Sequence, residues 1–91
     1  MAMCQDRTVI ITGSGGGLGR AYALAFAAEG ANVVVNDIRL DAAEEVVEEI
    51  KAAGGNAISN SNDITTTETA QQIVEDAIAA FGEVHVLVNN A

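Results

Sequence analysis

The feature of this sequence that most limits its fold is a strand-like run that leads directly into glycine. Residues 8–20 read TVIITGSGGGLGR, so five residues that favour β-strands precede a segment in which five of seven positions are glycine. An alanine-rich, helix-forming run follows at 19–29. The pattern predicts a buried strand, a tight turn of bare backbone and then a helix.

The same alternation of strand-like and helix-like segments continues to the end of the sequence. Apolar, β-branched runs at 32–36 and 84–88, and a weaker one at 56–60, predict three more strands. The segments 42–53 and 68–81 repeat apolar residues with the period of a helix. This order predicts an α/β fold in which helices cover both faces of a parallel sheet.

Residues that start and stop helices lie at the expected borders. Asp41 with Glu44, and Thr65 with Glu68, have the spacing of capping boxes. A glycine stands where each helix should end: Gly30, Gly54 and Gly82. Because proline is absent and no linker-like segment divides the chain, we expect residues 1–91 to form one unit.

The position of the first glycines, between a strand and a helix, indicates a phosphate-binding loop. The first N–H groups of a helix have no backbone partner, so they bind phosphate where no side chain blocks the approach. Gly13 would allow the tight turn, Gly17 the approach of a pyrophosphate, and Gly19 the packing of helix on sheet. Leu18 breaks the usual G-x-G-x-x-G spacing, which becomes Thr12-Gly13-x-x-x-Gly17-x-Gly19. The alternative interpretation is a flexible turn.

Asp37 ends the second predicted strand. An acid at this place, about 20 residues beyond the loop, can accept hydrogen bonds from the hydroxyls of an adenosine ribose. The alternative is an aspartate that caps the following turn. Loop and acid together predict a dinucleotide-binding, Rossmann-type doubly wound sheet whose first four strands lie in the order 3-2-1-4.

With these motifs, the sequence resembles the amino-terminal half of a short-chain dehydrogenase/reductase. The resemblance rests on the T-G-x-x-x-G-x-G loop, on Asn36-Asp37, on Asn62-Asp63 and on Asn89-Asn90-Ala91, and it spans essentially all 91 residues. The run GLGRAYALAFAAEGANVVVND is similar to the 3-hydroxyacyl-CoA dehydrogenase domain of multifunctional enzymes, peroxisomal and bacterial. The resemblance implies that residues 1–91 are an NAD(P)-binding half-domain of a longer single-domain enzyme.

The resemblance also implies which residues bind the cofactor. Thr12 would brace the loop against residues 89–91, and other loop residues would line the pyrophosphate and the nicotinamide side. Asp37 would hold the adenine ribose, Asp63 with Ile64 would contact the adenine, and 89–91 would form the ribose region and the floor of the site. The full set is Thr12, Gly13, Ser14, Gly17, Leu18, Gly19, Asp37, Asp63, Ile64, Asn89, Asn90 and Ala91.

NAD is the cofactor that the resemblance favours over NADP. Members that prefer NADP often have a basic residue at the position of Gly16 or lack the acid at position 37, and neither holds here. Arg39 could bind a 2′-phosphate, but Asp37 would repel that phosphate. We therefore favour an Arg39 whose charge is solvated. His85 replaces a common aspartate of the family, and we favour a structural contact over catalysis.

The catalytic residues of the family, a serine, an asparagine and a Tyr-x-x-x-Lys pair, lie beyond the Asn-Asn-Ala segment. Tyr22 is followed by Phe26 at the fourth position, and Lys51, the only lysine, lies in another predicted helix. We therefore assign no catalytic residue and interpret Tyr22 as a helix-packing residue. The implied function is NAD-dependent interconversion of a secondary alcohol and a ketone, with 3-hydroxyacyl-CoA as one suggested substrate. The alternative is a non-catalytic or S-adenosylmethionine-type nucleotide-binding domain.

Composition and charge narrow the choice of partners and compartment. There are 4 Lys and Arg against 13 Asp and Glu, a net charge of −9, which argues against nucleic acid and anionic membranes. Dinucleotide cofactor and small-molecule or acyl-CoA substrate are the expected partners. The glutamates between 44 and 49 are interpreted as a solvated face, and no metal ligands are expected. The single Cys4 and the lack of a membrane-length apolar run favour the cytoplasm, and the apolar edge at 84–89 predicts a homo-oligomer.

Overall fold

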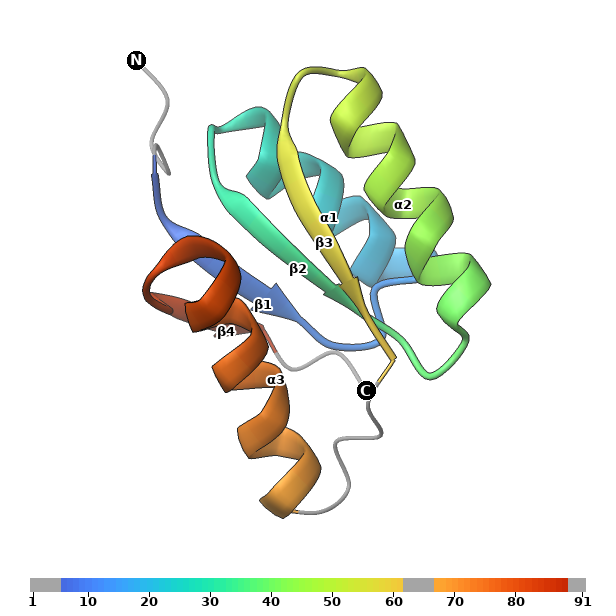
Figure 1. Ribbon diagram of the computed structural model, residues 1–91. Coiled ribbons are helices and arrows are strands. Elements are labelled where there is room, and N and C mark those ends of the chain that lie inside the picture. The colour runs from blue at the N-terminus through green and yellow to red at the C-terminus, as the bar shows by residue number, and fades with distance from the viewer. Residues whose placement is uncertain (1–5, 62–66, 89–91) are drawn as a thin grey trace.

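The computed structural model describes residues 6–61 and 67–88, which form one parallel β-sheet with helices on both faces (Figure 1). The strands are β1 (Thr8–Ile11), β2 (Asn32–Asn36), β3 (Asn56–Asn60) and β4 (Val86–Val88). The helices are α1 (Gly17–Ala28), α2 (Leu40–Ala52) and α3 (Thr67–Phe81). The alternation of strands and helices expected from the sequence is confirmed.

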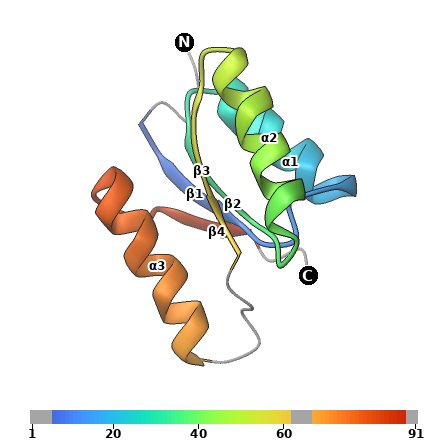
Figure 2. The same cartoon turned by 45° about the vertical axis from the view of Figure 1, so that its right-hand side comes forward.

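The strands lie in the order β3-β2-β1-β4 and every neighbouring pair is parallel. This is the order expected from the sequence, and the α/β, doubly wound fold class is confirmed. A helix joins each strand to the next, with α1 and α2 on one side of the sheet and α3 on the other (Figure 2). The order reverses between β1 and β4, so the carboxyl ends of these strands border the crevice where such sheets bind ligands.

Alternate residues of the central strands supply two separate cores. In β1, Val9 and Ile11 pack with α1 and α2, whereas Ile10 packs with α3. In β2, Val34 lies on the α3 side with Ile10, and its neighbours lie on the other side. All these side chains are fully buried because successive strand residues point to opposite faces and both faces are covered.

A glycine follows the end of each helix, as predicted, but one predicted helix start is wrong. Gly30, Gly54 and Gly82 follow the three helices with φ values of 89°, 90° and 91°, which favour glycine. In contrast, α2 begins at Leu40 with Arg39 as its N-cap, so Asp41 is not the capping residue. The reason is that the Asp37 carboxylate accepts the Arg39 N–H and starts the turn earlier. Thr65, the other predicted cap, lies outside the described residues.

Strand β4 begins two residues later than predicted, because a side chain replaces the backbone at its start. The His85 N–H donates to the Thr8 carbonyl at 3.0 Å, and the Thr8 N–H donates to Nδ1 of His85, also at 3.0 Å. The imidazole therefore takes the place of a backbone acceptor in the ladder. His85 makes the structural contact in the sheet that the sequence favours.

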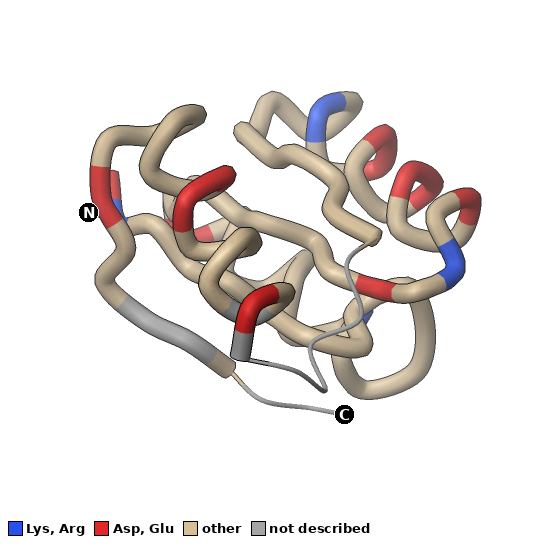
Figure 3. The backbone as a smooth tube through the Cα atoms, turned by 60° about the horizontal axis from the view of Figure 1, so that its bottom comes forward, with Lys and Arg blue, Asp and Glu red and all other residues tan. Residues whose placement is uncertain are grey.

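Most of the acidic residues in the described part of the chain belong to α2 and α3 (Figure 3). All four glutamates of α2 between residues 44 and 49 are exposed, as expected, and Glu49 forms an ion pair with Arg20 of α1. Among the described residues, no helix is long and apolar enough to cross a bilayer. In the same part of the chain, no three His, Cys, Asp or Glu side chains lie close enough to hold a metal ion.

Candidate cofactor-binding site

The glycine-rich loop after β1 is tied to the carboxyl ends of two strands. Gly13 turns the chain with a φ of 61°. The Ser14 N–H then donates to the Asn36 carbonyl at 2.9 Å, and its hydroxyl lies 2.7 Å from the Ile11 carbonyl and 3.2 Å from that of Asn36. Ser14 is fully buried, so it supports the loop from within.

The amino end of α1 is open to an anion. Gly16 is the N-cap and provides no side-chain hydrogen bond, and Gly17 has a φ of 57°. A Cβ added at Gly17 would meet nothing within 4 Å, so space is free beside the first N–H groups of the helix. Leu18 is 60% exposed next to this space, whereas Gly19 is buried against the sheet, as the predicted close packing requires.

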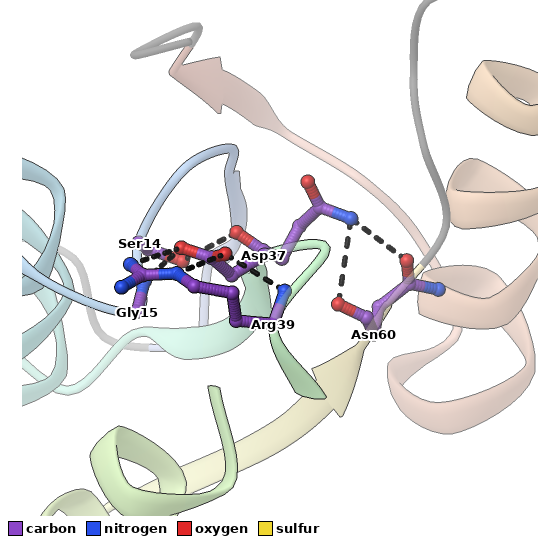
Figure 4. Close-up of polar contacts among 6 residues, drawn as sticks. Ser14, Gly15, Asp37, Arg39 and Asn60 are labelled. Atoms are coloured by element: carbon purple, nitrogen blue, oxygen red, sulfur yellow. Dashed lines mark hydrogen bonds and ion pairs between the residues drawn. The ribbon is translucent and has the colours of Figure 1, made fainter. Parts of the chain in front are cut away.

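Asp37 lies at the carboxyl end of β2 beside this loop, and four donors bind its carboxylate (Figure 4). Gly15 N–H donates to Oδ2 at 3.0 Å and Arg39 N–H to Oδ1 at 3.0 Å. The Arg39 guanidinium adds Nε to Oδ1 and Nη2 to Oδ2, each at 3.2 Å. Arg39, expected to be a solvated charge, has a side chain that is 64% exposed, and it also forms an ion pair with Asp37 that was not expected. The capping interpretation of Asp37 is correct, and it leaves the ribose interpretation untested.

Opposing effects set the pKa of the Asp37 carboxyl. Burial raises it, but the hydrogen bonds from the Arg39 side chain and from the N–H groups of Arg39 and Gly15 outweigh burial and lower the pKa below its ordinary 3.8. The carboxylate is therefore ionised at neutral pH. Its contacts stabilise the fold there, and this contribution is lost only as the pH falls through the lowered value. The same pair raises the pKa of Arg39 above its ordinary value.

Gly15 is a site residue that the sequence analysis missed. Its N–H binds Asp37, and a Cβ at Gly15 would lie only 2.7 Å from Oδ2 of Asp37. The parallel pairing of Ile11 with Val35 places the two chain segments that follow, the loop and Asp37, next to each other. That register is the signal that could have identified Gly15.

A second group that the sequence did not reveal holds the strand end that carries Asp37. The Asp37 N–H donates to the Asn60 carbonyl at 3.0 Å, and Nδ2 of Asn36 donates to Oδ1 of Asn60 at 2.8 Å. Nδ2 of Asn60 in turn donates to Asp76 of α3 at 2.8 Å. These contacts link β2, β3 and α3 directly behind the candidate site.

The structure shows where Thr12 and Tyr22 lie, but it does not describe five of the expected site residues. Thr12 donates from its N–H to the Val88 carbonyl at 3.0 Å and from its hydroxyl to the same oxygen at 3.4 Å, so it contacts the end of β4. Tyr22, expected to pack within the protein, is instead 39% exposed on α1. The remaining predicted site residues lie outside the described residues: Asp63, Ile64, Asn89, Asn90 and Ala91.

A glycine loop, an open helix end and a strand-end acid at one edge of a parallel sheet are shared by several nucleotide-binding families. The family model for the short chain dehydrogenases matches residues 7–91. This chain belongs to that family. The family binds a nicotinamide dinucleotide.

Known proteins of this family are similar over nearly the whole chain. The peroxisomal hydratase-dehydrogenase-epimerase of Saccharomyces cerevisiae is 50% identical over 96 residues, which cover 96% of this chain and 10% of the relative. A crystal structure of a short chain dehydrogenase from Mycobacterium avium is 50% identical with a TM-score of 0.92, and the match covers 96% of this chain and 34% of that one.

A third similar protein was solved with a cofactor. The structure of a 7α-hydroxysteroid dehydrogenase complexed with NADH and 7-oxo glycochenodeoxycholic acid is 44% identical, with a TM-score of 0.91. The match covers 93% of this chain and 33% of that one. The chain thus spans between 10% and 34% of the length of these three proteins. The expected resemblance to the dehydrogenase part of multifunctional enzymes is confirmed.

Proposed function

We propose that this chain supplies the NAD-binding part of an oxidoreductase that interconverts a secondary alcohol and a ketone. The observation that carries the proposal is that the open helix end at Gly17 and the ionised Asp37 lie side by side, joined by the Gly15 N–H. The helix end attracts phosphate, and the carboxylate accepts hydrogen bonds from hydroxyl groups. An adenosine diphosphate carries phosphates and ribose hydroxyls close together. Family membership and the dehydrogenase relatives support this assignment.

The residues of the chain have distinct tasks in this proposal. The first N–H groups of α1 hold the pyrophosphate, and Asp37 accepts hydrogen bonds from the adenosine ribose. When bound, the dinucleotide supplies or accepts the hydride at its nicotinamide ring. Ser14 and Thr12 keep the loop in place through their buried hydrogen bonds to strand ends. We assign Asp63 and Ile64 to the adenine, and residues 89–91 to the ribose region and the floor of the site.

The same geometry favours NAD over NADP. Asp37 is only 8% exposed and is ionised, so a 2′-phosphate placed against it would be repelled and poorly solvated. Gly16, next to the phosphate loop, adds no positive charge. The NADH in the structure of the related 7α-hydroxysteroid dehydrogenase supports this preference.

Substrate, assembly and compartment form a finer part of the proposal. Two of the relatives are named as a hydroxysteroid dehydrogenase and a hydratase-dehydrogenase-epimerase. We therefore propose that the substrate is either an acyl-CoA or a small secondary alcohol. We further propose a homo-oligomer in the cytoplasm. The peroxisome, named for the yeast relative, is the competing location, and microscopy of a fluorescently tagged full-length protein distinguishes the two.

Calorimetric titration of NAD⁺, NADP⁺ and S-adenosylmethionine into the purified protein tests the proposal. We expect NAD⁺ to bind most tightly. Asp37→Ala should weaken NAD⁺ binding by roughly 2–3 kcal/mol, because the ribose loses its charged acceptor, and should narrow the preference over NADP⁺. Equal dissociation constants for NAD⁺ and NADP⁺ would contradict the preference, and tighter binding of S-adenosylmethionine would contradict the oxidoreductase assignment.

A further inference from the structure

We propose that Arg39 is a latch on Asp37: its guanidinium occupies the side of the carboxylate that an adenosine ribose must take, so the cofactor binds only after Arg39 has moved away. The inference rests on the proposed function, because it concerns access to the same carboxylate. It adds a residue that opposes binding and lowers the affinity of the free protein for its own cofactor.

The Asp37 carboxylate already accepts four hydrogen bonds. A carboxylate has about four acceptor positions, two on each oxygen. Gly15 N–H and Arg39 N–H fill one position on each oxygen of Asp37, and Nε and Nη2 of Arg39 fill the others. A ribose with two hydroxyl donors therefore finds no free position until two of these four donors leave.

Of these four donors, only the two on the Arg39 side chain can leave the carboxylate. The two N–H donors belong to the backbone at the start of the glycine loop and of α2, so they are fixed by the fold. The guanidinium is held only by its side chain, which is 64% exposed, whereas the Asp37 side chain is 8% exposed. Rotation of Arg39 into solvent thus frees two acceptor positions without disturbing the core, and two is the number that a ribose diol needs.

The guanidinium of Arg39 also lies close to the glycine-rich loop. A Cβ added at Gly16, the N-cap of α1, would lie 3.6 Å from Nη2 of Arg39. The guanidinium therefore lies against the Asp37 carboxylate, as Figure 4 shows, and close to the N-cap of α1. In the proposed function the adenosine ribose lies between the same two groups, so Arg39 and the ribose compete for one space.

The latch predicts the direction in which Arg39→Ala changes the affinity for NAD⁺. Removing a cation near a diphosphate normally weakens binding, but removing the latch should tighten NAD⁺ binding, by roughly 2- to 5-fold for an ion pair this exposed. Arg20→Ala is the matched control, because Arg20 forms an exposed ion pair with Glu49 away from Asp37 and its loss removes the same charge. The control should leave NAD⁺ affinity unchanged or slightly weaker.

A double-mutant cycle on NAD⁺ binding by the purified protein tests the mechanism. In an Asp37→Ala background there is no carboxylate to release, so Arg39→Ala should give no gain. A gain that persists in that background, or weaker or unchanged binding by Arg39→Ala alone, overturns the latch. Failure of the unmutated protein to bind NAD⁺ overturns the proposed function and the latch together, so the two failures are distinguishable.

Nuclear magnetic resonance provides a readout that does not depend on affinity. The Arg39 Nε–H signal should be shifted by its hydrogen bond in the free protein and should move to the position of a solvated arginine when NAD⁺ is added. An Nε–H signal that keeps its free-protein position at saturating NAD⁺ overturns the proposal, because it shows that ribose and guanidinium bind together.

Discussion

At the scale of single residues, the site depends on a position where only hydrogen fits. A Cβ at Gly15 would lie 2.7 Å from Oδ2 of Asp37 and 2.9 Å from Cβ of Ala42. Real Cβ atoms essentially never approach other atoms so closely, so one neighbour would have to move. Ala42 belongs to α2, which packs on the sheet, and the Asp37 carboxylate is therefore the group that would be displaced.

Gly15→Ala should weaken NAD⁺ binding and lower the thermal stability of the protein. We expect a loss of about 1–3 kcal/mol in the free energy of unfolding, the usual cost of an added methyl group in a filled space. Thermal unfolding and calorimetric titration of NAD⁺ measure the two effects.

Gly16→Ala is the control for this substitution. Gly16 has an extended backbone with a φ of −173°, which alanine adopts readily, and the added Cβ would meet only the flexible end of Arg39 at 3.6 Å. Equal losses of stability in the two variants would show that the loop tolerates no side chain anywhere, and would refute the specific role of Gly15.

The sequence predicted the residues of this site better than their contacts. Asp37 could be placed because strand ends follow from the hydrophobic pattern, and the acid is at such an end. The ion pair with Arg39 could not, because the sequence does not say whether a side chain two residues away turns back or extends into solvent. The expectation of a solvated Arg39 rested on repulsion between Asp37 and a 2′-phosphate, and it omitted the attraction of Asp37 for the nearest cation.

At the scale of elements, a chain of amide and carboxylate groups fastens β2, β3 and α3 together at the edge that carries the site. Asn36 binds Asn60, and Asn60 binds Asp76. Asn60 is 7% exposed, so water contacts its amide little, and the amide depends on these protein partners for its hydrogen bonds. The backbone of Asn60 also accepts the Asp37 N–H, so the same strand end sets the position of the acid.

Asn60→Ala should reduce the free energy of unfolding by about 1–3 kcal/mol, because it removes one hydrogen bond of the Asn36 amide and one of the Asp76 carboxylate at once. Asn56→Ala is the matched control in the same strand: Asn56 is exposed and its amide bonds Asn32 at 3.3 Å on the surface. The control should change stability by less than about 0.5 kcal/mol. Urea denaturation measures the stability of both variants. Equal effects would contradict the role of the hydrogen bonds that link Asn36, Asn60 and Asp76.

The elements themselves were largely predictable, since their hydrophobic periods are clear and the glycines mark the helix ends. The errors occur where a side chain replaces a backbone partner. His85 replaces a carbonyl acceptor and shortens β4, and Asp37 replaces Asp41 as the acid that starts the turn into α2. Both contacts join residues whose proximity depends on the finished fold, so local spacing could not reveal them.

At the scale of the whole molecule, the two faces of the sheet are covered unequally. Two helices pack on one face and α3 alone on the other (Figure 2). On α3, Ile78 remains 46% exposed although the helix buries Ile73 and Ala77. Strand β4 ends the sheet on this side, and no strand lies beyond it within residues 6–61 and 67–88. An open strand edge and an exposed apolar side chain such as Ile78 each favour contact with another chain.

We therefore predict that residues 1–91, produced alone, associate in solution. The net charge of −9 on each copy opposes contact, so added salt should strengthen association by screening this repulsion. Ile78→Lys should weaken association because it places a charge on the exposed apolar face of α3. Ile38→Lys, which alters a 70% exposed isoleucine just beyond β2, should not. Sedimentation equilibrium over a range of concentrations measures the mass, and hydrogen exchange reports on residues 86–88. A constant mass of 9.3 kDa at every concentration, with protected amides along β4, would show that this edge needs no partner.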